Sequence, residues 1–253
     1  MNSTKRFTGR AENYVKYRPS YPPEVIDLLK RKAGLSSHSI VADIGSGTGI
    51  LTQLILPHAD QVYAVEPNGD MRLAAERNLK DQKGFISQAG TAEETHLPDK
   101  SVDLVTVAQA FHWFEPNRTR AEIKRILKPQ GKLALIWNDR RTDTSHFSQC
   151  YEELVKRLAI DYRSATQSKM VDEDKVARFF AHDHVERRSF NYAHDFDFEG
   201  LVGRTLSSSY APGPQDPRYE TMMKGLLSLF DQFQSAGRVR IEYGTEVFWG
   251  SVT

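Results

Sequence analysis

The amino-acid sequence predicts an α/β fold, in which a mainly parallel sheet carries helices on both faces. From residue 39 to residue 138, short runs rich in β-branched residues alternate with longer amphipathic stretches, a pattern typical of βαβ units. A glycine-rich turn follows the first of these runs, at residues 45–49. The chain has 253 residues, of which 39% are hydrophobic and 26% charged, as in an ordinary globular protein. This length favours a single domain over residues 1–253 rather than two small domains that share a cleft.

Five strands are expected where the β-branched residues gather, at residues 39–44, 61–66, 84–89, 102–108 and 132–137. The helices between them should begin near Thr48, Asn68 and Asn117. The helix from Asn117 should end at residues 128–131, because the proline and glycine of that segment interrupt helical hydrogen bonding. The segment after the third strand has no clear pattern.

After residue 139 the pattern becomes mainly helical. Helices are expected at residues 145–162, 173–180, 198–208 and 217–234. One strand is expected at residues 185–192, and the alternation at residues 239–252 indicates a closing strand or hairpin. The prolines and glycine of residues 211–214 should break the chain between the last two helices.

Charge balance and cysteine content argue against several classes of function. The 34 basic and 33 acidic side chains give a formal charge of +1, so we expect neither a nucleic-acid nor a membrane partner. Cys150 is the only cysteine, which excludes an internal disulfide and a multi-cysteine metal site. His182, His184 and His194 lack a convincing ligand spacing, so surface or capping roles suffice and we expect no metal. No apolar run approaches the ~20 residues of a membrane span, and the N-terminus lacks a signal-like core, which favours a soluble, cytoplasmic protein.

The glycine-rich turn joins a predicted strand to a predicted helix. Gly45, Gly47 and Gly49 have the spacing G-x-G-x-G, and missing side chains at such a junction let a ligand approach the backbone and the helix N-terminus. Residue 50 is isoleucine, so the dinucleotide fingerprint G-x-G-x-x-G is not met and a nicotinamide or flavin cofactor is disfavoured. The alternative is that the glycines only supply positive φ angles.

Glu66 closes the second predicted strand, seventeen residues after Gly49. An acidic side chain at this position can accept hydrogen bonds from both hydroxyls of an adenosine ribose. The alternative is a carboxylate that points into solvent at a strand end. Together, the turn and Glu66 predict a nucleoside-containing ligand more specifically than either feature alone.

Several motifs, in order along the chain, resemble the class I S-adenosylmethionine-dependent methyltransferases, in particular the methyltransferase type 11 domain. They are residues 43–49, Glu66, residues 90–93 before 97–99, residues 102–109 and residues 127–131. Two further segments, residues 17–22 and residues 111–114, are similar to those of trans-aconitate methyltransferase-like enzymes that act on small molecules.

The resemblance implies a Rossmann-like fold with a seven-stranded mixed sheet in the order 3-2-1-4-5-7-6, in which the last strand is antiparallel. Residues 36–140 would form the cofactor-binding core. An N-terminal lid at residues 1–22 would join helical segments at residues 143–182 and 197–235 to cover the acceptor. A monomer or homodimer is expected.

The resemblance also implies S-adenosylmethionine as cofactor. The glycine turn would lie beneath its methionine part, and Asp43 would order the turn or bind the amino group. Thr91 occupies a position where the family often has an aspartate that binds adenine, so the backbone of Ala92 and the side chain of Glu93 would serve instead. The complete expected set is Tyr17, Arg18, Asp43, Gly45, Ser46, Gly47, Thr48, Gly49, Glu66, Pro67, Met71, Thr91, Ala92, Glu93 and Gln109.

The acceptor is expected at the carboxyl ends of the fourth and fifth strands, where ligands collect in open α/β sheets. His112 is the candidate general base, because an imidazole titrates near neutral pH. Its alternative role is packing among the neighbouring aromatic residues. The residues expected to contact the acceptor are Tyr14, Trp113, Trp137, Arg140, Ser209 and Tyr210. Arginine suits a carboxylate-bearing acceptor.

Some of these residues have simpler interpretations. Tyr17 and Arg18 could belong to a solvated surface helix, and the serine run before Tyr210 could be only a turn. The expected reaction is methyl transfer to an O, N or C nucleophile of a small molecule. The alternatives are cyclisation or aminocarboxypropyl transfer with the same cofactor, and a protein that binds the cofactor without catalysis.

Overall fold

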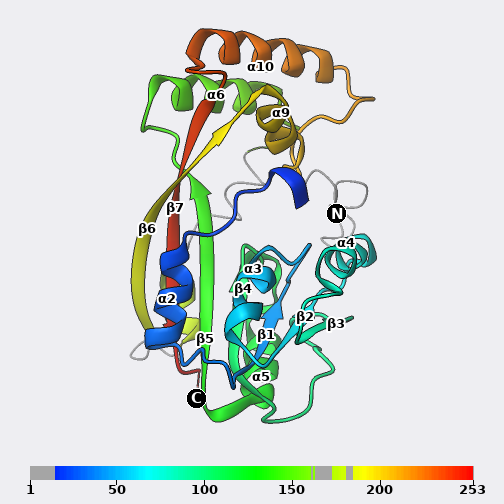
Figure 1. Ribbon diagram of the computed structural model, residues 1–253, viewed down its shortest axis with the longest axis vertical. Coiled ribbons are helices and arrows are strands. Elements are labelled where there is room, and N and C mark those ends of the chain that lie inside the picture. The colour runs from blue at the N-terminus through cyan, green and yellow to red at the C-terminus, as the bar shows by residue number, and fades with distance from the viewer. Residues whose placement is uncertain (1–14, 161, 163–172, 181–184, 253) are drawn as a thin grey trace.

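The structure is a computed structural model that describes residues 15–160, 162, 173–180 and 185–252. Its centre is a seven-stranded sheet in the order β3-β2-β1-β4-β5-β7-β6 (Figure 1). The strands are β1 (Ile40–Ile44), β2 (Gln61–Val65), β3 (Phe85–Gln88), β4 (Val102–Ala108), β5 (Leu127–Arg140), β6 (Val185–Phe196) and β7 (Val239–Gly250). The first five strands pair in parallel, and β7 is antiparallel to both β5 and β6. The expected Rossmann-like fold and strand order are confirmed.

Helices pack on both faces of this sheet. One apolar core joins α2 (Pro23–Lys32) and α3 (Ile50–Ile55) to the sheet, and another joins α5 (Pro116–Ile126) and α8 (Glu173–Phe179) to the opposite face. The central strands are buried because βαβ connections place helices over both of their faces, which explains their near-continuous apolar sequences. Among the described residues, no helix combines the length and apolar character that a membrane span needs.

A separate layer covers one end of the sheet. Strands β5, β6 and β7 are longer than the others, and their extended ends carry α6 (His146–Leu158), α9 (Phe198–Leu206) and α10 (Tyr219–Phe233) (Figure 1). Side chains of these helices and strands form a third apolar core. We call these three helices the cover. The first described residues of the chain pass between the cover and α4 (Gly69–Leu79), across the carboxyl ends of the parallel strands (Figure 1).

Three differences from the predicted elements have physical causes. Residues 128–131 end α5 as expected, but they also begin β5, because Leu127 pairs with Val102 before an irregularity in the ladder. Strand β5 continues to Arg140 since β7 pairs along its whole length. Helix α2, which has Pro23 at its first position and four buried aliphatic residues, was not predicted.

Candidate functional site

The glycine turn connects β1 to α3 with all three glycines in the left-handed region. The φ angles of Gly45, Gly47 and Gly49 are 70°, 59° and 85°. A Cβ on Gly45 would lie 2.5 Å from the Cβ of Ala110, and one on Gly49 would lie 2.6 Å from Leu79 Cδ1. A Cβ on Gly47 would meet nothing within 4 Å. Positive φ therefore explains part of this pattern, as the alternative interpretation held, but the open space above Gly47 also leaves room for a ligand.

Two hydroxyl groups in the turn have no hydrogen-bond partner in the described chain. Ser46 Oγ and Thr48 Oγ1 are both buried, and Thr48 as a whole is only 4% exposed. Buried hydroxyl groups almost always form hydrogen bonds, so these atoms indicate a polar ligand. They fit the amino-acid end of S-adenosylmethionine, which the resemblance placed over this turn.

Glu66 holds the glycine turn and the start of α4 together. One carboxylate oxygen accepts from the backbone N–H of Gly47 at 3.0 Å, and the other accepts from Asn68 N–H at 2.8 Å. The side chain lies inside the fold at 8% exposure, so the interpretation as a solvated strand-end carboxylate is wrong. A carboxylate has about four lone-pair sites, and two remain for sugar hydroxyls. Burial raises the pKa of Glu66, and the two backbone hydrogen bonds oppose this rise.

Asp43 lies beneath the turn and is almost completely buried. Its two oxygens accept from Thr52 Oγ1 at 2.6 Å and from Thr106 Oγ1 at 2.9 Å. Asp43 therefore ties β1 to α3 and to β4, which favours the loop-ordering role over a direct contact with the cofactor. Burial raises its pKa to about 6, against the opposing effect of the two hydroxyl bonds.

The residues expected around the adenine begin at the N-terminus of α4. Met71 is buried, whereas Pro67, just before the helix, is exposed. Ala92 is also buried, in the loop after β3. The carboxylate of Glu93 accepts from Glu115 N–H at 2.9 Å and is therefore engaged at the start of α5. Thr91 is exposed and bonds through its backbone to residue 94.

Gln109 directly follows β4 and has an unusual backbone conformation. Its φ angle is 57°, which is uncommon for a residue other than glycine and marks local strain that often accompanies a functional site. Its side-chain Nε2 donates to the backbone oxygen of Asn138 in β5 at 2.7 Å. The carboxyl ends of β4 and β5, where the acceptor is expected, are thus joined.

The aromatic turn η3 (Phe111–Trp113) follows this point directly. The ring of His112 lies 4.7 Å from that of Trp113, and both imidazole nitrogens are buried. Phe111 packs in the core against Phe179, with ring centroids 4.8 Å apart, and against Trp137 at 5.9 Å. Trp137 is 3% exposed, so this arrangement favours a core role for its ring over contact with an acceptor.

The first described residues contact the cover. The Tyr17 hydroxyl donates to Glu199 in α9, and its ring lies where a Cβ on Gly203 would be, with Cδ2 at 2.0 Å. Arg18 Nη2 donates to the backbone oxygen of Ser207 at 3.1 Å. These contacts show that the two residues are part of the packed structure, and their predicted contact with the cofactor stays a prediction. Tyr14 lies outside the described residues.

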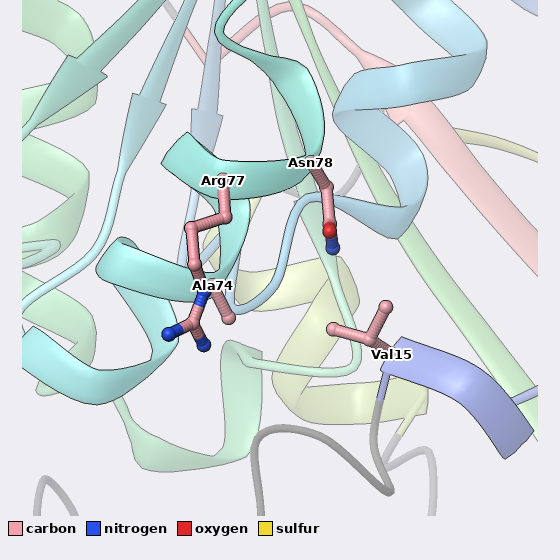
Figure 2. A pocket seen from close by; sticks show the side chains of 4 residues that line it. All are labelled: Val15, Ala74, Arg77 and Asn78. Carbon is pink, nitrogen blue, oxygen red and sulfur yellow. The ribbon is translucent and has the colours of Figure 1, made fainter.

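A small cavity separates the beginning of this segment from α4. It has a volume of about 230 Å³ and is lined by Val15, Ala74, Arg77 and Asn78. Figure 2 shows the Val15 side chain facing Ala74 and Asn78 of the helix. The chain therefore reaches from α4 on one side of the strand ends to α9 on the other.

Of the expected acceptor residues, Arg140 and Tyr210 contact the cover, and Ser209 directly precedes Tyr210. Arg140 donates from Nη2 to Glu152 in α6, and its guanidinium lies 4.7 Å from the centre of the Tyr151 ring. Ser209 and Tyr210 follow α9. Arg204, which was not predicted from the sequence, is buried in the same region. Its position three residues after buried Leu201 in α9 was the available signal, because that spacing places both on one helix face.

His194 stacks on Phe196 with ring centroids 4.3 Å apart. His182 and His184 lie outside the described residues. Over the part of the chain that the structure describes, no three His, Cys, Asp or Glu side chains form a group that could hold a metal ion.

Comparisons with known proteins identify the central part of the chain. Residues 42–135, which contain the glycine turn and Glu66, match the family model described as a methyltransferase domain. An uncharacterised methyltransferase of Mycobacterium tuberculosis is 43% identical over 127 residues, which are 50% of this chain and 49% of that relative. An uncharacterised methyltransferase of Schizosaccharomyces pombe is 34% identical over 153 residues, or 60% of each protein. The match thus spans about half of the mycobacterial relative and 60% of the yeast one.

Solved structures share the fold over nearly the whole chain. A candidate type II methyltransferase from Anaeromyxobacter dehalogenans has a TM-score of 0.64 and 19% identity, and covers 93% of this chain and 98% of its own. A candidate methyltransferase from an antibiotic biosynthesis pathway of Anabaena variabilis has a TM-score of 0.61 and 22% identity, with coverages of 90% and 96%. At these identities the likeness establishes the fold alone. The domain match assigns residues 42–135 to the methyltransferase domain family, and the related sequences together with the shared fold support a class I S-adenosylmethionine-dependent methyltransferase.

Proposed function

We propose that this protein uses S-adenosylmethionine to methylate an oxygen, nitrogen or carbon nucleophile of a small molecule. The observation that carries the proposal is the bond between Glu66 and the Gly47 N–H, beside the unpartnered hydroxyls of Ser46 and Thr48. A buried carboxylate with free lone pairs, next to a backbone turn open above Gly47, suits a ligand with sugar hydroxyls and an amino-acid end.

The residues of the site have separate proposed roles. The glycine turn supports the amino-acid end of the cofactor, and Glu66 accepts from the ribose hydroxyls. Met71 and Pro67 flank the adenine, whose edge faces the backbone of Ala92. When bound, the cofactor supplies a methyl group on a sulfonium, which is already a good leaving group. The protein therefore contributes mainly alignment of the acceptor and exclusion of water.

His112 is the residue that we propose to accept a proton from the acceptor. It lies three residues after Gln109, in the turn that follows the end of β4. The competing role is packing beside Trp113. Replacement by glutamine and by alanine separates the two roles. Loss of a base lowers kcat in both variants and removes the acidic limb of the pH profile, whereas packing alone would leave His112→Gln active with an unchanged profile.

The direct test is turnover of S-adenosylmethionine with a panel of small metabolites, analysed by mass spectrometry. The proposal predicts S-adenosylhomocysteine together with an acceptor that has gained one methyl group. Methylthioadenosine in place of S-adenosylhomocysteine would instead indicate cyclisation or aminocarboxypropyl transfer. Tight binding of S-adenosylhomocysteine with no product from any acceptor would favour a non-catalytic, cofactor-binding role.

A further inference from the structure

Two buried arginines lie near the same tyrosine, Tyr243, at the end of the sheet that the cover occupies. Arg140 at the end of β5 lies opposite Tyr243 of β7 in the strand ladder, so both side chains are on the same face of the sheet. Arg204 of α9 donates from Nε to the Tyr243 hydroxyl at 3.0 Å. The side chain of Arg140 is 9% exposed, and Arg204 is 6% exposed. We call Arg140 and Arg204 the arginine pair.

Among the described residues, Glu152 is the one carboxylate that forms an ion pair with a member of the arginine pair. Glu152 of α6 accepts from Arg140 Nη2, and it also accepts from the hydroxyl of Tyr162 and pairs with Lys156 at 3.2 Å. Its oxygens are therefore already engaged by three donors. Glu152 neutralises Arg140 and leaves no charge for a second guanidinium.

Arg204 has only neutral partners in the described chain. Besides the Tyr243 hydroxyl, its Nη1 donates to Ser208 Oγ at 3.2 Å. No ion pair joins it to a described carboxylate, although its side chain is almost completely buried. A buried charge without a counter-ion is costly and is usually paired. The region therefore carries one uncompensated positive charge.

Tyr210 lies close enough to both arginines to affect their pKa values. Burial and the charge of Arg204 act to lower the pKa of Arg140, and the neighbouring Tyr151, Tyr210 and Glu152 outweigh them. Tyr210 also acts on Arg204. The loop that follows α9 therefore lies within electrostatic reach of both guanidinium groups.

Two polar atoms in this region are buried and have no hydrogen-bond partner in the described chain. They are Arg140 Nη1 and Ser209 Oγ. A buried guanidinium N–H that lacks an acceptor loses its hydration without compensation, which makes it a good donor for an anionic ligand. The unpartnered donors and the uncompensated charge are independent observations that indicate the same class of ligand.

The arginine pair lies close to the expected site of reaction. Arg140 is two residues beyond Asn138 in β5, and the Asn138 backbone oxygen accepts from Gln109 at the end of β4. Two residues of strand span about 6.5 Å, which is within the size of one small metabolite. A single acceptor can therefore reach both points.

We propose that the acceptor carries a carboxylate, and that Arg140 and Arg204 bind it with Ser209 and Tyr210 beside it. The buried groups, two arginines and Glu152, together carry a single positive charge, because the Lys156 partner of Glu152 is 58% exposed and its charge is solvated. A carboxylate balances this buried charge, and a phosphate dianion exceeds it. This inference rests on the proposed function, because it assigns the anchor of the same acceptor.

The experiment measures binding of small carboxylates to the protein saturated with S-adenosylhomocysteine. Acetate, benzoate and succinate are compared by calorimetry with their neutral amides, and inorganic phosphate is titrated separately. We expect at least one carboxylate to bind about ten- to a hundredfold more tightly than its amide, since charge-assisted hydrogen bonds are lost in the amide. Binding of S-adenosylhomocysteine itself is measured first, so that failure of the proposed function is recognised separately.

Matched variants assign the effect to the arginine pair. Arg204→Met and Arg204→Lys should lower carboxylate affinity about tenfold or more and leave S-adenosylhomocysteine affinity unchanged. The lysine variant keeps the charge if the methionine variant fails to fold. Arg240→Met is the control, because Arg240 is an exposed residue that pairs with Asp195. Equal affinity for acids and amides, tighter binding of phosphate than of every carboxylate, or full carboxylate affinity in a folded Arg204 variant would each overturn the proposal.

Discussion

The carboxylate of Glu66 accepts a hydrogen bond from the backbone N–H of Gly47 at 3.0 Å, so the end of β2 and the turn after β1 form one unit. The parallel pairing of these strands places the two residues next to each other, because Ile44 lies opposite Val65 in the ladder. In the proposed site, binding of a nucleoside and ordering of the turn therefore depend on the same side chain.

The first prediction concerns Glu66. Glu66→Ala should lower the affinity for S-adenosylhomocysteine about ten- to a hundredfold, since it removes the acceptor of the ribose hydroxyls and the bond that holds Gly47. Calorimetry measures the affinity, and circular dichroism checks that the variant is folded. Glu220→Ala in the exposed first turn of α10 is the control and should bind normally. Equal affinity in the two folded variants would remove Glu66 from the site.

The three glycines of the turn should respond differently to alanine. Gly45→Ala places a Cβ 2.5 Å from Ala110 Cβ, so it should destabilise the fold by about 2–4 kcal/mol through both φ strain and overlap. Gly47→Ala meets open space and should cost only about 1–2 kcal/mol of backbone strain. It should nevertheless weaken S-adenosylhomocysteine binding, because the new methyl group occupies the ligand's side of the turn. Urea unfolding measures the loss of stability, and calorimetry measures the loss of S-adenosylhomocysteine affinity. A Gly47→Ala variant less stable than Gly45→Ala would contradict the described packing.

The raised pKa of Asp43 predicts that the stability of the fold depends on pH. Its pKa is raised by burial from 3.8 to about 6, so the folded protein binds more protons than the unfolded chain between these values. The stabilising contribution of Asp43 to the free energy of unfolding is therefore fully present below about pH 4 and is lost as the pH rises through about 6. This loss of free energy is at most about 3 kcal/mol. Asp43→Asn keeps the size of the side chain and should remove this part of the slope in urea unfolding measured from pH 4 to 7. An unchanged slope in the variant would show that Asp43 does not titrate in this range.

The contact between Tyr17 and Gly203 predicts how the first described residues are held. Gly203→Ala should displace the Tyr17 ring, which lies 2.0 Å from the position of the added Cβ. Trypsin should then cleave faster after Lys16, and the KM for the acceptor should rise. Gly213→Ala is the control, since a Cβ there meets nothing within 4 Å. Equal cleavage rates in both variants would contradict the docking of this segment on α9.

Much of the fold could be predicted because each feature is local in the sequence. The buried parallel strands are short β-branched runs, and the glycine turn and Glu66 follow the first two of them directly. The length of β5 was underestimated because its last residues depend on pairing with β7, which is distant in the sequence. Similarly, nothing local separates the ring of Trp137, which is part of the core, from that of an exposed pocket residue.

Arg204 shows why the proposed acceptor site was harder to predict. Its partners Tyr243 and Ser208 come from β7 and from the end of α9, and its neighbour Arg140 comes from β5. The uncompensated charge exists only because these elements meet beneath the cover. Sequence spacing identifies a residue type on a helix face, but a charge balance requires the tertiary contacts.

A crystal structure with S-adenosylhomocysteine bound tests the role of Glu66 most directly. We expect both ribose hydroxyls at hydrogen-bond distance, about 2.7 Å, from the Glu66 carboxylate, with the amino-acid end against Ser46 and Thr48. A ligand bound elsewhere, or a Glu66 side chain turned away from the sugar, would contradict this role.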